Sequence, residues 1–368
     1  GLRAIGEALD ELYGARIESA VRKEGETLCI GFLSDCIDEA YAPGAAGLTA
    51  RVIRLLADLL YDPYLQDGVF CPDYTAGERE NLIDRIAAQK NDPRSWAPKR
   101  LTELMCNDEA YGQPALGTTE QARKITEKKL YAAYQRALGE AQVELFYCGT
   151  MAPDAVEALF ADTPLVRQRA GAPYQPQTQI VAQPAGAPRE VIEEEQVTQG
   201  KLSLGFRTGG HCLTGGDPAA CWMFQTLYGG STSSKLFLNV RERKSLCYYA
   251  SAQFIASKGL MMVNSGIENK DFETARDEIV RQLEACRAGD ITDAEIESAR
   301  KTLTTNWRAM LDDPLTLERY WLGQAAAGTL VAPEERIAQV QDVTRERIVA
   351  AAQATALDTV YFMKGAAQ

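Results

Sequence analysis

The sequence predicts an α+β fold built from two similar halves, and three observations support this prediction. With 368 residues the chain is longer than one hydrophobic core usually supports, so two domains are expected. Hydrophobic residues make up 46% and charged residues 24%, as in ordinary globular proteins, which excludes general disorder. Motifs of the first half also recur in the second half, as expected of an internal repeat.

The repeat consists of three matched features that recur in the same order. An Asp-Pro step follows a helix, a Gly-Thr pair leads to a second Thr, and an apolar strand runs into a Gly. The matched positions lie 221, 218 and 216 residues apart, at Pro93 and Pro314, Thr126 and Thr344, and Gly149 and Gly365. Two unrelated α+β domains are the alternative, but three features at a nearly constant offset argue against a chance match.

A stretch rich in Pro and Gly separates the two copies. Because Pro fixes φ and lacks a backbone donor, residues 167–190 are expected to form an extended linker. We therefore predict an N-terminal domain over residues 1–166 and a C-terminal domain over residues 191–368.

The two predicted domains share an order of elements. In the C-terminal domain the pattern predicts a strand, two helices and a hairpin, at residues 201–206, 217–228, 233–244, 248–256 and 260–266. In the N-terminal domain a helix over residues 2–12 precedes a hairpin in the same way, and an apolar strand over 143–149 closes the copy. Residue 1 therefore falls inside the first copy, which is expected to lack its opening strand and first helix, and we interpret the sequence as truncated or processed.

Charge, cysteine and histidine content exclude several classes of protein. A net charge of −12 argues against a nucleic-acid partner, and charges interrupt every apolar run, which argues against a membrane span. Nine scattered cysteines without a C-x-x-C pair predict no disulfide framework and a reducing compartment, which we take to be the cytoplasm. His211 is the only histidine, so these residues alone cannot supply a zinc site with two His ligands.

A motif between residues 229 and 248 resembles a known signature. Two glycines are followed by a Ser/Thr cluster, a Leu-Phe pair, an Arg-Glu pair and, seven residues after the Arg, a Tyr. The residues are Gly229-Gly230, Ser231 to Ser234, Leu236-Phe237, Arg241-Glu242 and Tyr248. This pattern resembles the C-terminal-domain signature of the pitrilysin and mitochondrial-processing-peptidase family, the zinc peptidases with an inverted H-x-x-E-H motif. Further family motifs occur earlier in the chain, in the order that the family has them, at Glu78-Arg79, Asn91-Asp92-Pro93 and Tyr111-Gly112. The resemblance therefore spans nearly the whole chain.

The resemblance implies both a fold and a distribution of the catalytic groups between domains or chains. It implies two similar two-layer α/β domains, each an antiparallel sheet with helices packed on one face, in a clamshell arrangement that closes around an extended peptide. In the family the zinc ion sits in one N-terminal domain, and a C-terminal domain donates an Arg and a Tyr toward the scissile carbonyl. In bacterial heterodimeric members one chain keeps the zinc motif and the other keeps the Arg/Tyr pair.

The position of the third zinc ligand indicates which of these two chains is present. The family pattern places a Glu seven residues after the Glu of the Glu-Arg pair, and this position holds Arg85. A zinc ion and a guanidinium about 4 Å apart would repel each other by roughly 8 kcal/mol at an effective dielectric of about 20. The adjacent Asp84 points about 100° round the helix and does not replace the ligand. We therefore predict that this chain binds no zinc.

Arg241 and Tyr248 are the predicted catalytic donors. Peptide hydrolysis develops negative charge on the scissile oxygen, and donors aimed at that charge lower the barrier. Arg241 stays protonated and can fork to an oxyanion, whereas Tyr248 offers a neutral O–H donor. A solvated helix end is the alternative explanation for Arg241, and Tyr249 is the neighbouring rival of Tyr248. Gly229 and Gly230 are expected to allow a tight turn, and Ser233 to cap the helix that carries Arg241.

The sequence therefore predicts a non-zinc-binding, Arg/Tyr-donating subunit of a heterodimeric zinc metallopeptidase that cleaves peptides. The expected partners are a homologous zinc peptidase subunit with the H-x-x-E-H motif, which holds the zinc, and a peptide substrate. The chain alone is expected to bind no cofactor and to be inactive, and it could form a homodimer. A complete zinc peptidase truncated before its H-x-x-E-H helix and a catalytically silent scaffold or binding homologue are the two alternatives.

Overall fold

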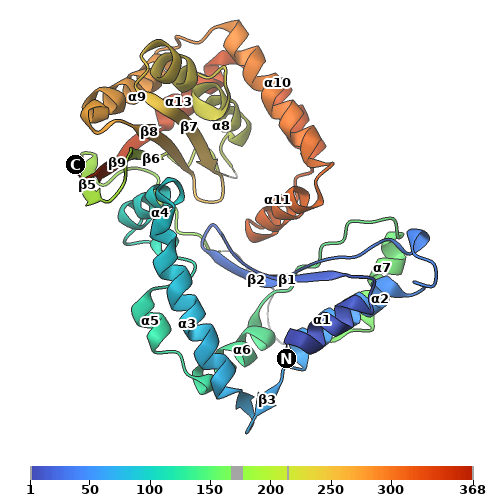
Figure 1. Ribbon diagram of the computed structural model, residues 1–368. Coiled ribbons are helices and arrows are strands. Elements are labelled where there is room, and N and C mark those ends of the chain that lie inside the picture. The colour runs from blue at the N-terminus through green and yellow to red at the C-terminus, as the bar shows by residue number, and fades with distance from the viewer. Residues whose placement is uncertain (1, 167–176, 214, 367–368) are drawn as a thin grey trace. The chain divides into compact units, whose positions relative to one another are not determined.

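The computed structural model describes residues 2–166, 177–213 and 215–366 (Figure 1). It contains helices and mainly antiparallel strands, which confirms the α+β fold. The chain divides into two compact units, unit 1 with Gly1–Ile86 and Ala115–Gln175, and unit 2 with Ala87–Pro114 and Pro176–Gln368. None of the described helices is both long and apolar enough to cross a lipid bilayer.

These units do not coincide with a simple division along the sequence. The segment Ala87–Pro114 belongs to unit 2, although it lies inside the predicted N-terminal domain over residues 1–166. The predicted linker, residues 167–190, begins outside the described residues, and its described part has no regular structure before a strand begins at Arg189. The domain boundaries at residues 166 and 191 stay a prediction.

Unit 2 is built on a five-stranded sheet with the strand order β5-β9-β6-β8-β7. The strands are β5 (Arg189–Glu195), β6 (Gly200–Arg207), β7 (Cys247–Ile255), β8 (Leu260–Ile267) and β9 (Ala356–Gly365). All neighbours pair antiparallel except β5 and β9, which are parallel. The predicted strand and hairpin of this half are therefore present, and alternation along β6 sends Leu202, Leu204 and Phe206 into the main core.

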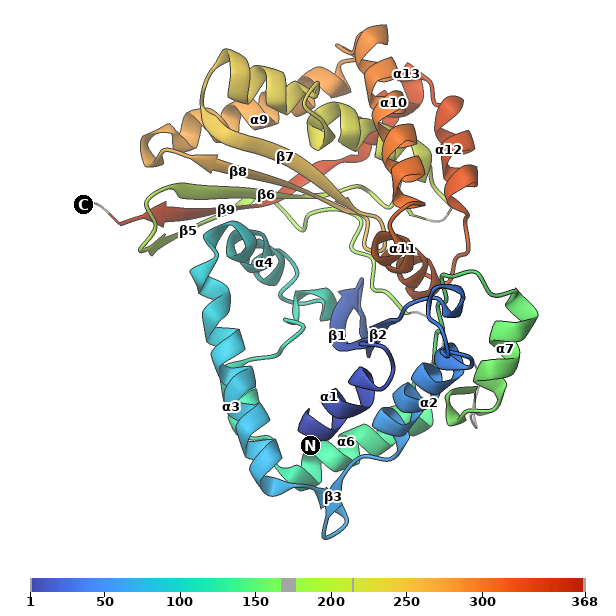
Figure 2. The same ribbon diagram turned by 45° about the vertical axis from the view of Figure 1, so that its right-hand side comes forward.

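Helices cover one face of this sheet (Figure 2). They are α8 (Pro218–Gln225), α9 (Phe272–Arg287), α10 (Asp293–Met310), α12 (Pro333–Gln341) and α13 (Arg345–Ala354), and α11 (Pro314–Ala326) follows α10. The opposite face carries α4 (Pro93–Met105), whose Ala97 and Leu101 pack with Met262 and Tyr361. A Cβ atom at Gly205 would lie 2.5 Å from the Met105 sulfur, so a larger residue here would require the Met105 side chain to move.

A buried charge network fixes the end of α4 on the sheet. Arg207 pairs with Glu109 at 2.8 Å and with Asp358 at 2.6 Å, and Lys258 pairs with Glu109 at 2.6 Å. Burial alone would raise the pKa of the Glu109 carboxyl, but Lys258 and Arg207 lower it overall. The charge of each buried side chain is therefore compensated by its neighbours.

Unit 1 has two small cores and only short sheets. Its helices are α1 (Leu2–Asp10), α2 (Leu48–Tyr61), α3 (Pro72–Ala88), α5 (Thr119–Arg123), α6 (Glu127–Glu140) and α7 (Pro153–Ala161). Its strands are β1 (Arg16–Glu24) and β2 (Thr27–Asp35), which form the predicted hairpin, and the short pair β3 (Leu65–Gln66) and β4 (Val69–Phe70). Leu12, Leu48 and Val52 form one core, and Ile53, Ala57 and Leu165 form the other.

The strand predicted over residues 143–149 is not formed, so this prediction is wrong. In unit 2 the matching strand, β9, pairs with β5 on one side and with β6 on the other. Among the described residues of unit 1, no strand corresponds to β5 or β6. A strand without hydrogen-bonded neighbours is unstable in water, which explains why the apolar pattern alone does not order it.

Two of the three matched features of the repeat have the same structural role in both copies. Asp92 and Asp313 are N-cap residues, each directly before a helix whose first residue is Pro. Thr126 and Thr344 also cap helices, accepting hydrogen bonds from the backbone N–H groups of Lys129 and Arg347. The repeat is therefore largely a repeat of helix start signals.

One disulfide corrects the expectation drawn from the cysteine pattern. Cys212 and Cys221 are bonded, with their Cα atoms 5.6 Å apart. The loop after β6 folds back on the start of α8, because the Asp217 N–H donates to the His211 carbonyl at 2.6 Å. The spacing of the cysteines in the sequence did not predict that this loop brings Cys212 next to Cys221.

Replacing Glu109 with Gln is expected to destabilise unit 2 by about 3–5 kcal/mol, because two buried cations lose their shared carboxylate. Urea unfolding followed by tryptophan fluorescence measures this, since all four Trp residues (96, 222, 307 and 321) lie in unit 2. The control is Glu297→Gln in an exposed ion pair on α10, which should cost less than about 1 kcal/mol. Equal losses in the two variants would contradict the role given to the network.

Candidate functional site

The two predicted donors lie on neighbouring elements of unit 2. Arg241 is in the last turn of a π-helix, η6 (Leu236–Arg243), and Tyr248 is the second residue of β7. A second π-helical segment, η5 (Thr226–Gly230), immediately precedes the Ser/Thr cluster. π-Helical turns are rare in proteins and occur frequently at functional sites.

A tight turn connects η6 to β7. Ser245 has a φ of +50°, the left-handed conformation that commonly ends a helix. Its N–H donates to the Arg241 carbonyl at 3.0 Å, and the Leu246 N–H donates to the Val240 carbonyl at 3.0 Å. These bonds fix the backbone of Arg241 relative to the start of β7. The seven-residue spacing between Arg241 and Tyr248 is therefore set by one compact turn at the C-terminal end of η6.

The glycine pair and the serine cluster act differently from the prediction. Gly229 and Gly230 do not adopt positive φ values. A Cβ atom at Gly229 would lie 2.7 Å from the Ala252 backbone nitrogen, so glycine serves close packing of η5 on β7. Ser234 accepts a weak bond from the Phe237 N–H at 3.4 Å, whereas the Ser233 hydroxyl bonds to Ser298 at 2.7 Å. The predicted cap at Ser233 is therefore wrong, because the N-cap of η6 is Lys235, which makes no side-chain capping bond.

Three polar contacts anchor η6 to the helices behind it. At its start Lys235 pairs with Glu295 at 2.9 Å, and at its middle the Asn239 amide donates to Gln282 at 2.7 Å. At its end Lys244 pairs with the buried carboxylate of Glu278. The helix that carries Arg241 is thus held at both ends and at its centre.

Glu278 is the most strongly perturbed group in this set. Its side chain on α9 also accepts from Arg281 at 2.8 Å and from Gln282 at 2.6 Å. Burial alone would raise the pKa of this carboxyl, but hydrogen bonds from Arg281, Lys244 and Gln282 together lower the pKa from 4.5 to about 2. Glu278 therefore stays ionised at neutral pH and stabilises the attachment of η6.

The Arg241 guanidinium is available to a ligand. Its side chain is 41% exposed, and its nearest carboxylate, Glu242, lies 3.6 Å away on the same helix. The guanidinium carbon lies 4.7 Å from the centre of the Phe237 ring, which supports the side chain from one side. The contact with Glu242 is longer than a hydrogen bond, so the donors of Arg241 remain free to fork to an oxygen ligand.

Tyr248 occupies an irregular position in β7. The pairing with β8 shifts between Cys247 and Tyr249, so Tyr248 is the extra residue of a β-bulge. Its ring is 61% exposed, and its O–H donates to a carboxylate oxygen of Glu268 at 2.8 Å. This hydrogen bond, with the negative charge of Glu268, raises the pKa of the phenol. Tyr248 is therefore a protonated donor at neutral pH.

Tyr249, the neighbouring rival, has a different environment. Its ring is half-buried and lies 4.5 Å from the Arg94 guanidinium carbon. Burial raises the pKa of Tyr249, and Arg94 partly opposes this rise. Sequence reasoning missed Glu268 and Glu278, because each reaches its partner through strand register or helix packing rather than through a local motif.

The residues that the structure describes do not fit a zinc ion. Arg85 is an exposed side chain in the penultimate turn of α3, in unit 1. Over the described ranges 2–166, 177–213 and 215–366, no three His, Cys, Asp or Glu side chains lie together in a way that could hold a metal. No step of the chemistry discussed below is therefore assigned to a metal held by these residues.

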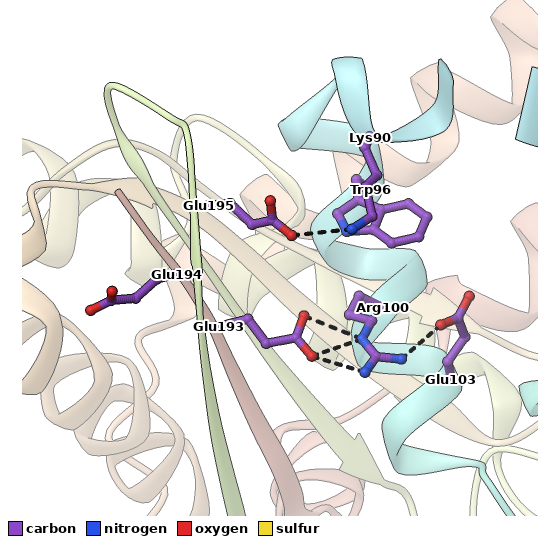
Figure 3. A pocket seen from close by; sticks show the side chains of 7 residues that line it. All are labelled: Lys90, Trp96, Arg100, Glu103, Glu193, Glu194 and Glu195. Carbon is purple, nitrogen blue, oxygen red and sulfur yellow. Dashed lines mark hydrogen bonds and ion pairs between the residues drawn. The ribbon is translucent and has the colours of Figure 1, made fainter. Parts of the chain in front are cut away.

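A hollow of about 560 Å³ lies between α4 and β5 (Figure 3). Its charged lining residues are already paired, Lys90 with Glu195 at 3.3 Å, and Arg100 with both Glu193 at 2.8 Å and Glu103 at 3.0 Å. The pair of Arg100 with Glu193 attaches α4 to the edge of the sheet, and the pair of Lys90 with Glu195 attaches the turn before α4. These ion pairs leave little unpaired charge for a ligand, and neither predicted donor lines the hollow.

Comparison with known proteins gives consistent results. The family pattern described as "Peptidase M16 inactive domain" matches residues 124–303. The "probable inactive metalloprotease YmfF" of Bacillus subtilis is 34% identical over 365 residues, which cover 99% of this chain and 84% of that protein. An "uncharacterized zinc protease" of Mycobacterium leprae is 25% identical over 307 residues, covering 82% of this chain and 67% of that protein.

Solved structures agree with these sequence matches. A conserved protein from Enterococcus faecalis superposes with a TM-score of 0.86 at 28% identity, covering 99% of this chain and 85% of the other. A peptidase M16 inactive domain from Pseudomonas fluorescens superposes with a TM-score of 0.73 at 17% identity, covering 100% and 84% of the two chains. The second match supports the fold alone.

Replacing Glu278 with Gln is expected to cost about 3 kcal/mol at pH 7, the free energy that corresponds to lowering the pKa from 4.5 to about 2. Because the folded-state pKa is depressed, this stabilisation is complete above about pH 5 and is lost as the pH falls from 4.5 through 2. Tryptophan-monitored urea unfolding at several pH values measures it. Glu284→Gln, an exposed residue of α9, is the matched control, and an equal pH-independent loss in both variants would contradict the assignment.

The phenol of Tyr248 should titrate above its usual pKa of 10, and Glu268→Gln should return it toward that value, because the accepting carboxylate is lost. Carbon-13 NMR of ring-labelled tyrosine follows the titration, and Tyr248→Phe identifies the resonance. The control is Glu273→Gln, which removes an equal charge from an exposed position in the first turn of α9. A Tyr248 pKa that is the same in both Gln variants would show that the hydrogen bond to Glu268 does not form in solution.

Proposed function

This chain belongs to the M16 peptidase family, and we propose that it is the zinc-free subunit of a heterodimeric metallopeptidase, supplying Arg241 and Tyr248 to the active site of its partner. The partner would be a homologous subunit that holds the zinc on an H-x-x-E-H motif. The substrate would be a peptide. A bacterial cytoplasmic location is also proposed, but the cysteines no longer support it, because Cys212 and Cys221 are bonded.

The observation that carries the proposal is that one turn, between η6 and β7, presents both an exposed Arg and an exposed Tyr. In the same chain the expected position of the third zinc ligand holds a cation. Arg241 and Tyr248 are held by the turn at Ser245 and by the contacts of η6. Arg85 cannot ligate zinc. Donors of this kind combined with a cation at the expected ligand position support a partner that supplies the metal.

Each donor has a defined task in such a complex. As water adds to the scissile carbonyl, the oxygen becomes negatively charged, and the fixed positive charge of Arg241 favours that state over the ground state. Tyr248 can donate its O–H to the same oxygen, because its raised pKa keeps the proton in place. The O–H bond to Glu268 would exchange for a bond to the substrate.

The mixed complex should lose roughly 10²–10³ in kcat when Arg241 is replaced by Ala, because one oxyanion donor is removed. Arg243→Ala is the matched control, since this Arg lies on the same helix and donates only to Asn239 at 3.0 Å. Turnover of a fluorogenic peptide is measured with gel filtration and zinc analysis, which should show unchanged assembly and metal content.

Unchanged turnover in Arg241→Ala would contradict the proposed function and favour a catalytically silent scaffold. Stoichiometric zinc on this chain, with peptide hydrolysis in the absence of a partner, would favour a complete zinc peptidase. A homodimer of the isolated chain would be compatible with the proposal only if it is inactive.

A further inference from the structure

Two cations at the end of the unit 2 sheet, close to Tyr248, lack an ion-pair partner among the residues that the structure describes. Arg94, in the first turn of α4, stacks on the Tyr249 ring with its guanidinium carbon 4.5 Å from the ring centre. Lys201, the second residue of β6, donates to the Gln199 side chain at 2.6 Å. Neither forms an ion pair with any carboxylate among the described residues.

Strand register brings these side chains to one place. Lys201 on β6 and Tyr249 on β7 both pair with Gly266, which lies on β8 between them. A Cβ atom at Gly266 would lie 2.7 Å from the Tyr249 ring and 2.8 Å from the Gln199 amide oxygen. Because glycine leaves this space open, the Tyr249 ring lies across β8 toward Gln199 and Lys201. Arg94 covers the ring, so Arg94 and Lys201 flank one surface formed by the Tyr249 ring, which we call the shelf.

The shelf has an excess of positive charge. Desolvation lowers the pKa of Lys201, and the nearby charge of Arg94 lowers it further, while Asp92 opposes this. Asp92 is already engaged as the N-cap of α4, accepting from the Arg94 N–H at 3.1 Å and the Ser95 N–H at 3.3 Å. The carboxylate of Glu268 is likewise occupied by Tyr248. An added anion would therefore reduce the repulsion between two partly compensated cations.

We infer that Arg94, Lys201 and Tyr249 form a carboxylate-binding subsite beside Tyr248, which takes an acidic side chain or the free C-terminus of a bound peptide. Arg94 offers a planar fork that matches a carboxylate, and its stacking on Tyr249 fixes the plane of that fork. Lys201 adds a point charge from the adjacent strand. The inference rests on the proposed function, because the peptide is the one polarised by Arg241 and Tyr248.

The test is peptide binding to the full chain, measured by fluorescence anisotropy. Three labelled ten-residue peptides share one neutral sequence. The first peptide has an amidated C-terminus and a single Glu, whose position is varied along the sequence in a series. The second is also amidated and has Gln in place of Glu. The third has the same sequence as the second but a free C-terminus. A carboxylate-bearing peptide should bind at least about tenfold more tightly than the neutral one, since a charge-assisted bidentate bond is gained. The arm that shows the gain identifies the source of the carboxylate.

The double variant Arg94→Gln/Lys201→Gln should abolish this preference and leave binding of the neutral peptide unchanged. The matched control is Arg243→Gln/Lys301→Gln, which removes the same charge from exposed positions elsewhere on unit 2. Equal binding of acidic and neutral peptides, or no binding of either, would overturn the inference, as would an equal loss in the control. The comparison of peptides on the unmodified chain decides this even if a variant unfolds.

These outcomes separate the subsite from the proposed function. A complex that needs Arg241 for turnover but shows no carboxylate preference would refute the subsite alone. A carboxylate preference in a complex that does not need Arg241 would refute the proposed function and leave an acidic-peptide binding site.

Discussion

The buried carboxylate of Glu278 is the constraint on which the site depends most directly. It joins α9 to the end of η6 through Lys244, and it is stabilised by Arg281 and Gln282. A π-helix has poorer internal hydrogen bonding than an α-helix, so its position must come from tertiary contacts. Arg241 stands one turn before Lys244, and the charge of Glu278 therefore decides where the guanidinium is presented.

A second constraint is the assignment of residues 87–114 to unit 2. Residues 115–175 of unit 1 separate this segment from the rest of unit 2 in the sequence, yet α4 packs on the second face of the sheet. Ion pairs with β5 hold one side of α4, and the network of Glu109, Arg207 and Lys258 holds its end. The same packing places Arg94 over Tyr249, so a residue remote in sequence becomes part of the surroundings of Tyr248.

The sequence predicted much of the fold, because local signals and the structure agree at particular residues. The predicted hairpins formed. The sequence singled out Asp92, Thr126, Asp313 and Thr344 only as repeated positions, and the structure shows that each is a helix N-cap. The strand over 143–149 did not form, since a strand needs neighbours that its own pattern cannot supply. The Cys212–Cys221 disulfide was missed because it depends on a loop returning to α8.

The candidate site was only partly predictable for the same reason. The spacing of Arg241 and Tyr248 was visible, since one cap sets it, but the partners Glu268 and Glu278 lie on other elements. The central claim is that Arg241 and Tyr248 donate to the scissile oxygen of a peptide at an active site whose metal another chain holds. The most direct measurement is the zinc content and peptide hydrolysis of the purified chain, alone and mixed with a zinc-bearing M16 subunit. The account predicts no zinc and no hydrolysis alone, and hydrolysis in the mixture; one zinc per chain with unaided hydrolysis would contradict it.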